Sequence, residues 1–414
     1  MRGKFALVVL FTLFASSAFA ANTPVPVYTF ICNGNASRMG PCPQGGRPNS
    51  LIQGSDGNFY GAAQVTMEAS TSSQGGVVFS LTPAGKLTVL HTFTAGPNKN
   101  YADGNFPTLL TEGPDGKLYG YTTFGGIDGI NGCDFLCGYG VIYRVDRRGS
   151  GFQIIHQFCA DGCSGDYRET ASALVTGKDG NLYGTIVNGS SNGSIFRITP
   201  STGAYEVVFN FSFPGGYGYA SALTAAPDGT FYTMSLGANP ALLLHYTPAT
   251  GGLTTTDVSF PSFDGDLPSS NVSGLTFGPN GNRYGLYQVY AEEGTGLFEI
   301  EPDGTDLQLF PFYIATVSAG PDGLILASDG NFWMANYYGT DIYGSIISIS
   351  PASGALLQTF ATFSQTAGVG AFPAALIQAK DGTLWGSTYG YGGASTGHFA
   401  DGTVFSLNAD LPPR

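Results

Sequence analysis

Short runs of alternating apolar and polar residues, each ended by a turn, recur along the chain. The first clear copy contains four such runs, at 51–54, 58–62, 77–81 and 87–93. Alternation with a period of two, bounded by Gly, Pro and Asp, is typical of half-buried β-strands. The pattern therefore predicts a unit of four short antiparallel strands.

One five-residue phrase, Asp-Gly-x-[Phe/Leu]-[Tyr/Trp], marks each unit. It occurs at 56–60, 115–119, 179–183, 228–232, 329–333 and 381–385. A degenerate copy, Asn-Gly-Asn-Arg-Tyr at 280–284, supplies a seventh, and successive copies are 49 to 64 residues apart. A β-sandwich would lack such a period and a β-helix would have a much shorter one. The repeat predicts an all-β fold, a seven-bladed β-propeller of four-stranded antiparallel blades.

The Asp-Gly pair joins the first two strands of each unit. Asp-Gly favours a two-residue type I′ hairpin turn, in which both central residues have positive φ. Seven Asp or Asn residues in a ring could suggest calcium, but turn chemistry alone accounts for them.

The end of the chain predicts how the ring closes. The last unit stops at 404–407 without a fourth strand, whereas the segment 25–30 ends like the fourth strand at 87–93. We therefore expect the N-terminal strand to close the last blade. The predicted domain, 21–414, has blades at about 49–93, 107–158, 171–211, 220–260, 272–312, 322–363 and 373–407.

Residues 1–20 have the pattern of a signal peptide. Arg2 and Lys4 precede an apolar stretch at 5–14, and Ala18-Phe19-Ala20 provides a small-x-small cleavage site. A membrane anchor would need about 20 apolar residues. The segment predicts secretion to the periplasm or the medium, with no membrane span.

The composition of the chain limits the classes of binding partner that we expect. The formal net charge is −13, only 11% of residues are charged, and no basic stripe is present, so nucleic acid is not expected to bind. Aromatic residues make up 13% of the chain and 62 residues are Gly, which suits short strands and tight turns. We expect a monomer.

The cysteine count is even, which favours disulfides in an exported chain. The six are Cys32, Cys42, Cys133, Cys137, Cys159 and Cys163. Cys32 and Cys42 share one loop and are expected to pair. The other four can pair in three ways, among which the sequence does not choose, and structural zinc is the less favoured alternative.

The repeat resembles the GloVer-type extracellular tandem repeat of exported bacterial proteins. The resemblance rests on Leu-x-x-x-x-Asp-Gly-x-Leu-Tyr-Gly, followed by Gly-x-Val-Phe-x-Leu and a fourth strand that ends in Phe; the copies at 109–158 and 376–407 fit best. It covers essentially the whole mature chain and implies a secreted repeat protein, without implying an activity.

The long loops between second and third strands, and between blades, should lie on one face of the propeller. Variable loops on a rigid scaffold commonly carry binding sites, and Tyr rings can stack on sugars. Loop aromatics include Phe106, Tyr337 and Tyr389. The predicted ligand-binding residues are Tyr101, Phe124, Tyr139, Tyr167, Tyr338, Tyr391 and His398. For any single ring, packing against the blades is the alternative.

No catalytic residue is predicted. His91 and His156 occupy equivalent fourth-strand positions and are interpreted as structural, as is His245. His398 lies near Asp401, but no nucleophile accompanies them. No cofactor is expected, although calcium is a possible ligand of acidic loop residues such as Asp103.

These patterns favour a secreted, non-enzymatic binding or scaffold propeller that recognises extracellular carbohydrate or a protein partner through its long-loop face. The alternatives are an extracellular enzyme (a lyase, lactonase or glycan-cleaving hydrolase) with its site at the channel mouth, and a structural surface-layer component.

Overall fold

A computed structural model of the chain describes most of residues 21–414. The described segments are 23–32, 42–65, 75–94, 101–126, 138–158, 170–172, 174–187, 193–211, 219–236, 241–258, 274–289, 294–304, 307–312, 319–337, 343–364, 368–390 and 402–414. The predicted signal peptide lies outside them.

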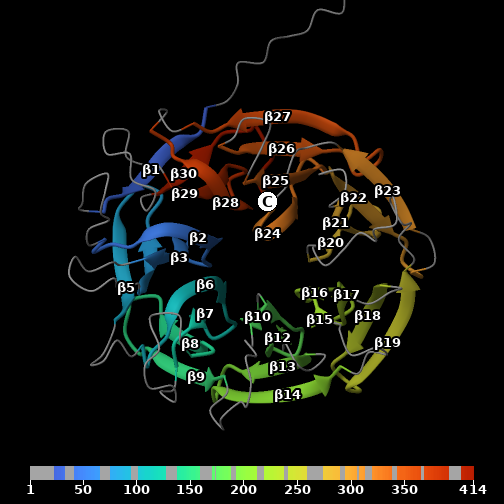
Figure 1. Cartoon of the computed structure of the whole chain (residues 1–414), viewed down its shortest axis with the longest axis horizontal. Helices are drawn as coiled ribbons and strands as arrows, with labels where there is room; N and C mark the ends of the chain where they lie inside the picture. The colour runs from blue at the N-terminus through green and yellow to red at the C-terminus, as the bar shows by residue number, and fades with distance from the viewer. Residues whose placement is uncertain are drawn as a thin grey trace, which may run out of the picture.

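Seven antiparallel sheets surround a central axis and form the blades of a propeller (Figure 1). The strands of blades one and two are β2 (Gly46–Gln53), β3 (Phe59–Val65), β4 (Gly76–Leu81), β5 (Leu87–Phe93), β6 (Asn105–Glu112), β7 (Lys117–Phe124), β8 (Val141–Asp146) and β9 (Gln153–Gln157). Those of blades three and four are β10 (Thr170–Ala171), β11 (Val175–Thr176), β12 (Leu182–Val187), β13 (Ser194–Thr199), β14 (Ala204–Asn210), β15 (Tyr219–Ala220), β16 (Thr224–Ala225), β17 (Phe231–Leu236), β18 (Ala241–Thr247) and β19 (Gly252–Val258).

The remaining blades follow the same order. The strands of blades five and six are β20 (Thr276–Phe277), β21 (Arg283–Val289), β22 (Gly294–Ile300), β23 (Leu307–Phe312), β24 (Ala319–Leu326), β25 (Phe332–Asn336), β26 (Ser345–Ile349) and β27 (Leu356–Thr362). Blade seven contains β28 (Ala371–Gln378), β29 (Leu384–Gly390), β30 (Gly402–Leu407) and β1 (Val25–Phe30). The described residues contain no helix. The predicted seven-bladed all-β fold is confirmed.

The N-terminal strand closes the ring. β1 is the outermost strand of blade seven and pairs antiparallel with β30, from Val25 opposite Ser406 to Phe30 opposite Gly402 (Figure 1). Phe30 is fully buried against blade one. The predicted closure is confirmed.

The apolar core lies between the blades. Each of the seven large clusters of buried apolar side chains combines residues from two neighbouring blades. At the closure, Phe59 of blade one stacks on Trp385 of blade seven, with ring centroids 3.9 Å apart. A single blade therefore has no core of its own, and the ring is the unit of stability.

The Asp-Gly turns differ from the prediction. In the first, Gly57 donates to the carbonyl of Gly54 and Gly54 donates to the carbonyl of Asn58, which defines a three-residue loop. Gly57 has a φ of 84°, whereas Asp56 is not in the positive-φ region. The two-residue type I′ prediction was therefore wrong. The geometry matches a type I turn followed by a left-handed glycine, and all seven units repeat these backbone bonds.

Most neighbouring blades are joined near the axis of the ring by one of two polar links. At three consecutive junctions the inner strand of one blade ends in Gln or Glu. A side-chain oxygen of this residue accepts the backbone N–H of the first residue of the turn in the preceding blade. These pairs are Gln378 with Ser328, Gln53 with Lys380, and Glu112 with Ser55. They span the arc formed by blades six, seven, one and two.

At three further junctions the turn begins with a proline, which has no N–H to donate. Pro114, Pro227 and Pro279 occupy this position in blades two, four and five. At each of these junctions an inner-strand threonine instead donates to a leucine carbonyl of the next blade. The three donors are Thr111, Thr224 and Thr276. Six of the seven junctions therefore use one of these two links. The turn of blade three begins with Lys178 instead, and there the hydroxyl of Thr185 donates to the carbonyl of Ser221 in blade four.

Candidate ligand-binding site on the loop face

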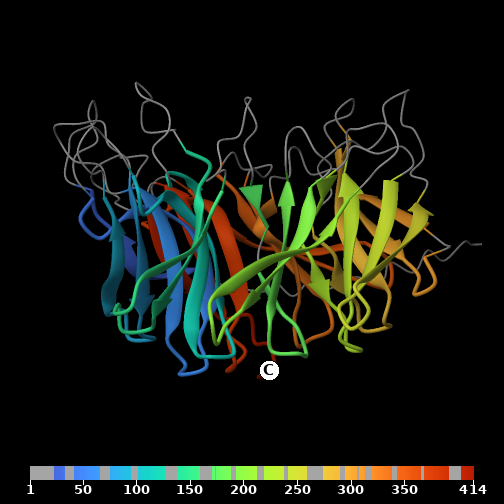
Figure 2. The same ribbon diagram turned by 90° about the horizontal axis from the view of Figure 1, so that it is seen from below.

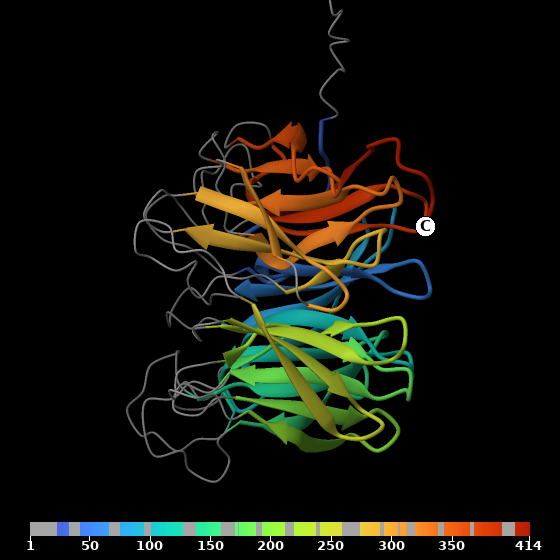
Figure 3. The same ribbon diagram turned by 90° about the vertical axis from the view of Figure 1, so that its right-hand side faces the viewer.

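The two ends of the ring differ in what they carry. One end, the turn face, carries the Asp-Gly turns and the C-terminus (Figures 2 and 3). The opposite end, the loop face, is where β3 ends and β4 begins, and where the inner strand of each blade starts. The candidate site lies at the inner part of the loop face.

In three inner strands the second residue has a strained backbone and precedes a proline. Arg47, Phe106 and Phe372 have φ values of 56°, 57° and 62°. The residues after them are Pro48, Pro107 and Pro373. Left-handed backbone costs a non-glycine residue about 1–3 kcal/mol, and such strain tends to persist where the surrounding structure enforces it.

Close packing between blades enforces this conformation. Phe372 donates its N–H to the Tyr343 carbonyl of blade six at 2.8 Å. A Cβ added to Gly344 would lie 2.4 Å from Cδ of Pro373. Because a glycine on the neighbouring blade leaves space for the proline ring, the chain can turn sharply and direct the preceding side chain across the junction.

Two of these residues contribute to a set of planar side chains, which we call the planar row. The planar row consists of Tyr337, Phe372, Tyr389, Arg47 and Gln64. It crosses blades six, seven and one. All five side chains are partly exposed.

Contacts between successive members hold the planar row together. Phe372 stacks on Tyr337 with ring centroids 5.0 Å apart, and Tyr337 meets Tyr389 edge-on at 6.0 Å. The guanidinium of Arg47 lies over the ring of Tyr389, 5.2 Å from its centroid. The hydroxyl of Tyr389 donates to Oε1 of Gln64 at 3.2 Å. Stacking, hydrogen-bonding and cationic groups are thus gathered at one place.

Arg47 differs from the other arginines in the described segments. A buried Nε without a partner is shared by Arg47, Arg197 and Arg283, but the guanidinium of Arg47 makes no hydrogen bond within these segments and contacts the ring of Tyr389 instead. Arg148 is exposed to solvent. The remaining five arginines hydrogen-bond to side-chain or backbone oxygens; they are Arg144, Arg147, Arg197, Arg283 and Arg414.

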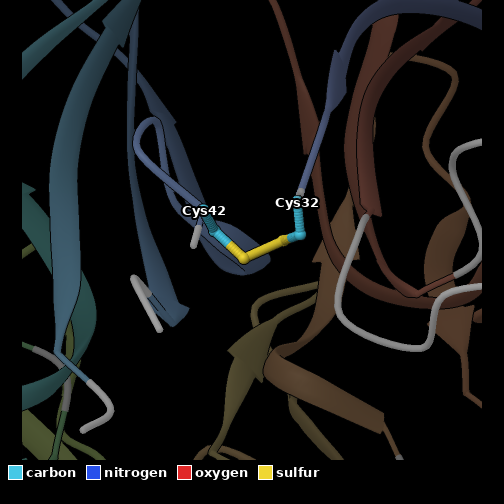
Figure 4. The surroundings of a disulfide bond; sticks show 2 residues. All are labelled: Cys32 and Cys42. Carbon is cyan, nitrogen blue, oxygen red and sulfur yellow. A yellow bond between two sulfur atoms is a disulfide. The ribbon is translucent and has the colours of Figure 1, made fainter. Parts of the chain in front are cut away.

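A disulfide anchors the segment that leads into Arg47. Cys32, just after β1, bonds to Cys42, and both residues are buried against Val65 (Figure 4). The N–H of Gly45 then donates to the Cys42 carbonyl at 2.9 Å, which forms a tight turn before β2. The Cys32–Cys42 pairing is as expected from the sequence, and it fixes the backbone five residues before Arg47.

The predicted ligand-binding residues divide into two groups. Tyr101 and Phe124 are 4% and 8% exposed, so they pack within the protein and offer no open ring face. Tyr139 is partly exposed and packs against the core between blades two and three. The other four lie outside the described residues: Tyr167, Tyr338, Tyr391 and His398. So do Cys133, Cys137, Cys159 and Cys163.

Two histidines on outer strands are packed against the neighbouring blade. The ring of His91 stacks on Phe152 at 3.6 Å, and its Nε2 lies 3.0 Å from Oδ2 of Asp103. His156 stacks in the same way on Tyr205, at 3.7 Å. Burial lowers the pKa of His156 below its ordinary value. Both rings therefore serve the packing of the repeat.

The turn aspartates are engaged by their own hairpins. Asp56 accepts hydrogen bonds from the hydroxyl of Tyr60 and from the backbone and side chain of Asn58. Burial raises its pKa, but these hydrogen bonds outweigh burial and the net pKa is lowered. Within the described segments no group of three His, Cys, Asp or Glu side chains could hold a metal ion.

Blade five shows how the turn tolerates loss of the carboxylate. Asn280 replaces the aspartate, and the nearly buried Glu299 of the third strand supplies the acceptor instead. Its Oε1 accepts from the hydroxyl of Tyr284 at 2.6 Å and from Nδ2 of Asn280 at 3.0 Å. The hydrogen-bonded tyrosine is thus retained while its partner moves to another strand.

The sequence reasoning missed Arg47, Gln64 and Phe372 as site residues. A signal for two of them was present, because Arg47-Pro48 and Phe372-Pro373 stand in equivalent repeat positions at the start of the inner strand. The contact of Arg47 with Tyr389 joins the first blade to the last and depends on ring closure.

The fold and the partly exposed planar row define a repeat propeller with a candidate binding surface at one mouth of the ring. The model of the Gloeobacter/Verrucomicrobia repeat matches residues 23–241 and 193–405, so the chain belongs to this family. The resemblance inferred from the repeated phrase is confirmed.

Solved structures share the fold at low identity. The extracellular domain assigned to a hybrid two-component system of B. thetaiotaomicron superposes with a TM-score of 0.53 at 11% identity over 88% of this chain, which spans 40% of that chain's length. The Dos1 propeller gives 0.51 at 10% identity, with 87% of this chain and 78% of that chain covered.

A protein of Bacteroides fragilis assigned as a 6-phosphogluconolactonase gives a TM-score of 0.50 at 15% identity, covering 82% of this chain and 94% of that one. At these identities the likeness shows the fold alone. No curated protein matches the sequence. Within the described segments, no helix has the length and apolar character needed to cross a membrane.

Proposed function

We propose that this protein is an exported, non-enzymatic binding propeller that holds carbohydrate on its loop face. The planar row is the observation that carries the proposal. Tyr337 and Tyr389 combine apolar ring surface with a hydroxyl, and Gln64 adds an amide beside them. Sugars present an apolar ring face surrounded by hydroxyls, so this combination matches them chemically. The blades provide a rigid support, which lowers the entropy lost on binding.

Export is supported by two features. Residues 1–20 have the charge and apolar pattern of a signal peptide, and the Cys32–Cys42 disulfide is typical of proteins that mature in oxidising compartments. The mass of the secreted protein tests this part: cleavage after Ala20 is expected, and retention of the first 20 residues in the cytoplasm would contradict it.

Carbohydrate binding is tested with residues 21–414 and a panel of neutral and acidic oligosaccharides. A ligand at 100 times its dissociation constant adds about 2.7 kcal/mol to the free energy of unfolding, so a binder should raise the melting temperature. Tyr337→Ala should weaken the binding of any hit, whereas Leu357→Ala, an exposed change on outer strand β27, should not. Equal affinity of both variants would contradict the assigned surface.

The non-enzymatic part needs its own measurement. Oligosaccharides incubated with the protein and separated by chromatography should be recovered intact. Cleavage products that form only with the folded protein would show that it is an enzyme and would contradict this part of the proposal.

A further inference from the structure

We infer that Arg47 makes the planar row selective for acidic sugars, through pairing of its guanidinium with the carboxylate of a uronate residue. The inference rests on the proposed carbohydrate binding and adds the class of sugar. Its starting point is the state of Arg47, a partly buried cation whose guanidinium makes no hydrogen bond in the described part of the chain.

Such a group is uncommon because buried polar atoms are normally hydrogen-bonded. A guanidinium has five N–H donors in a plane, and that of Arg47 lies over the face of Tyr389. Stacking on a ring uses the face of the guanidinium and leaves its edge free. A carboxylate binds along that edge with two parallel hydrogen bonds.

The neighbours of Arg47 define what else the ligand must present. The rings of Tyr389 and Tyr337 lie next to one another, with centroids 6.0 Å apart, and Phe372 extends the apolar surface beyond them. A ligand with a carboxylate beside an apolar ring face satisfies both requirements. A uronate residue has this arrangement, because its carboxylate is attached to the sugar ring.

The position of Arg47 is prepared before any ligand arrives. Its left-handed φ of 56°, the following Pro48 and the turn that starts at Cys42 all restrict the backbone. Such preorganisation reduces the ordering cost of binding. The net charge of −13 repels polyanions in general, so selective capture of an anionic sugar requires a local cation such as Arg47.

The experiment compares trigalacturonic acid with its methyl ester, which keeps the sugar rings and removes the charges. Oligomers of guluronate and of glucuronate test other ring stereochemistries, and a sulfated galactan oligosaccharide tests a non-carboxylate anion. Dissociation constants are measured by calorimetry for residues 21–414 and for Arg47→Gln, Arg47→Asn and Arg47→Lys. Asn is included because it tolerates left-handed backbone well, so it separates the loss of charge from backbone strain. Arg148→Gln, an exposed change, is the control of equal charge.

At least one uronate oligomer should bind more tightly than the methyl ester and the sulfated sugar. Arg47→Gln and Arg47→Asn should both weaken uronate binding roughly tenfold or more, since each removes charge-assisted hydrogen bonds to the carboxylate. Arg47→Lys should fall between these variants and the unchanged protein, and Arg148→Gln should bind like the unchanged protein. Melting temperatures of all variants report whether they fold.

Two results would overturn the inference without contradicting the proposed function. One is equal binding of the acid and its methyl ester; the other is a preference for the acid that survives Arg47→Gln. If neutral sugars bind, and Tyr337→Ala abolishes that binding, the planar row remains a carbohydrate site without acid selectivity. Absence of binding by any oligosaccharide would overturn both proposals.

Discussion

Oε1 of Gln53 in blade one accepts a hydrogen bond from the backbone N–H of Lys380 in blade seven, at 2.9 Å. This bond adds to the pairing of β1 with β30 and joins the two ends of the ring on its inner side. Gln378 and Glu112 make the same link at the two adjacent junctions. Where the turn begins with proline instead, the partner position on the next blade holds no Gln or Glu, so the two residues are matched to one another at these six junctions.

Replacing Gln53 by Ala should lower the free energy of unfolding by about 1 kcal/mol, the usual net value of one hydrogen bond. Urea denaturation followed by tyrosine and tryptophan fluorescence measures the change. The matched control is Thr176→Ala, at the equivalent inner-strand position of blade three, opposite Pro114, which has no N–H to donate. A loss of stability in the control as large as in Gln53→Ala would contradict the assigned role of the junction bond.

The Asn280–Glu299 pair in blade five should show strong coupling. Asn280→Asp places a second carboxylate beside Glu299 and should destabilise the protein by about 1–3 kcal/mol, because like charges in a nearly buried site repel. Glu299→Ser alone removes the acceptor for Tyr284. The double variant Asn280→Asp with Glu299→Ser recreates the arrangement of blade one, where Asp56 accepts from Tyr60 and Ser80 pairs opposite that tyrosine.

Unfolding free energies of the four proteins give the coupling. The double variant should be more stable than the sum of the single effects predicts, by about 1 kcal/mol or more. Simple additivity would show that the carboxylate of Glu299 does not replace that of the turn aspartate.

His156 should make stability dependent on pH. Burial lowers its pKa in the folded state, so between that pKa and the unfolded value of about 6.5 the unfolded chain binds more protons. The stability that the protein gains by burying a neutral His156 is therefore fully present above about pH 6.5 and is lost as the pH falls. Phe209 occupies the equivalent position in blade three, opposite Ile195 as His156 is opposite Ile142.

Replacing His156 by Phe removes this titration. The free energy of unfolding should therefore fall less between pH 7.5 and pH 5 in His156→Phe than in the unchanged protein. Urea denaturation at the two pH values measures the difference. An unchanged pH dependence would show that the ring of His156 is not held in its neutral form by the fold.

The repeated Asp-Gly phrase was sufficient to predict seven blades, and the similar endings of segments 25–30 and 87–93 were sufficient to predict their closure. The type of turn was not predicted correctly, because an Asp-Gly pair fits both a two-residue and a three-residue loop. In the structure the carboxylate of Asp56 accepts the N–H of Asn58 and the hydroxyl of Tyr60, which favours the longer loop. That preference depends on a side chain four residues away.

The site was harder to predict than the fold. An aromatic residue in a loop can face solvent or pack inward, and Tyr101 and Phe124 pack inward. Arg47 meets Tyr389 because the ring closes and because Pro48 packs against Gly402 of blade seven, where a Cβ would lie 2.7 Å from Cδ of the proline. Such contacts form between residues that are far apart in the sequence and meet only in the assembled ring, so local sequence patterns do not predict them.

The Cys32–Cys42 disulfide should affect the candidate site more than the fold as a whole. It closes a loop with a sequence separation of 10, and in the chain-entropy model such a cross-link contributes about 2–3 kcal/mol to stability. Replacing both cysteines by Ser should lower the melting temperature while the ring, held by seven inter-blade cores, still forms. Since Gly45 donates to the carbonyl of Cys42, the same change should loosen the turn before Arg47.

Binding to uronate oligomers should therefore weaken in the Cys32→Ser/Cys42→Ser variant more than binding to neutral ones, because Arg47 acts on the acidic group alone. Calorimetry measures the binding of the acid and of its methyl ester to this variant and to Gln53→Ala, which is weakened at the turn face. The comparison separates the positioning of Arg47 from overall stability. If the two cysteine replacements weaken acidic and esterified ligands equally, or if Gln53→Ala shows the same selectivity loss, the disulfide acts through overall stability and does not position Arg47.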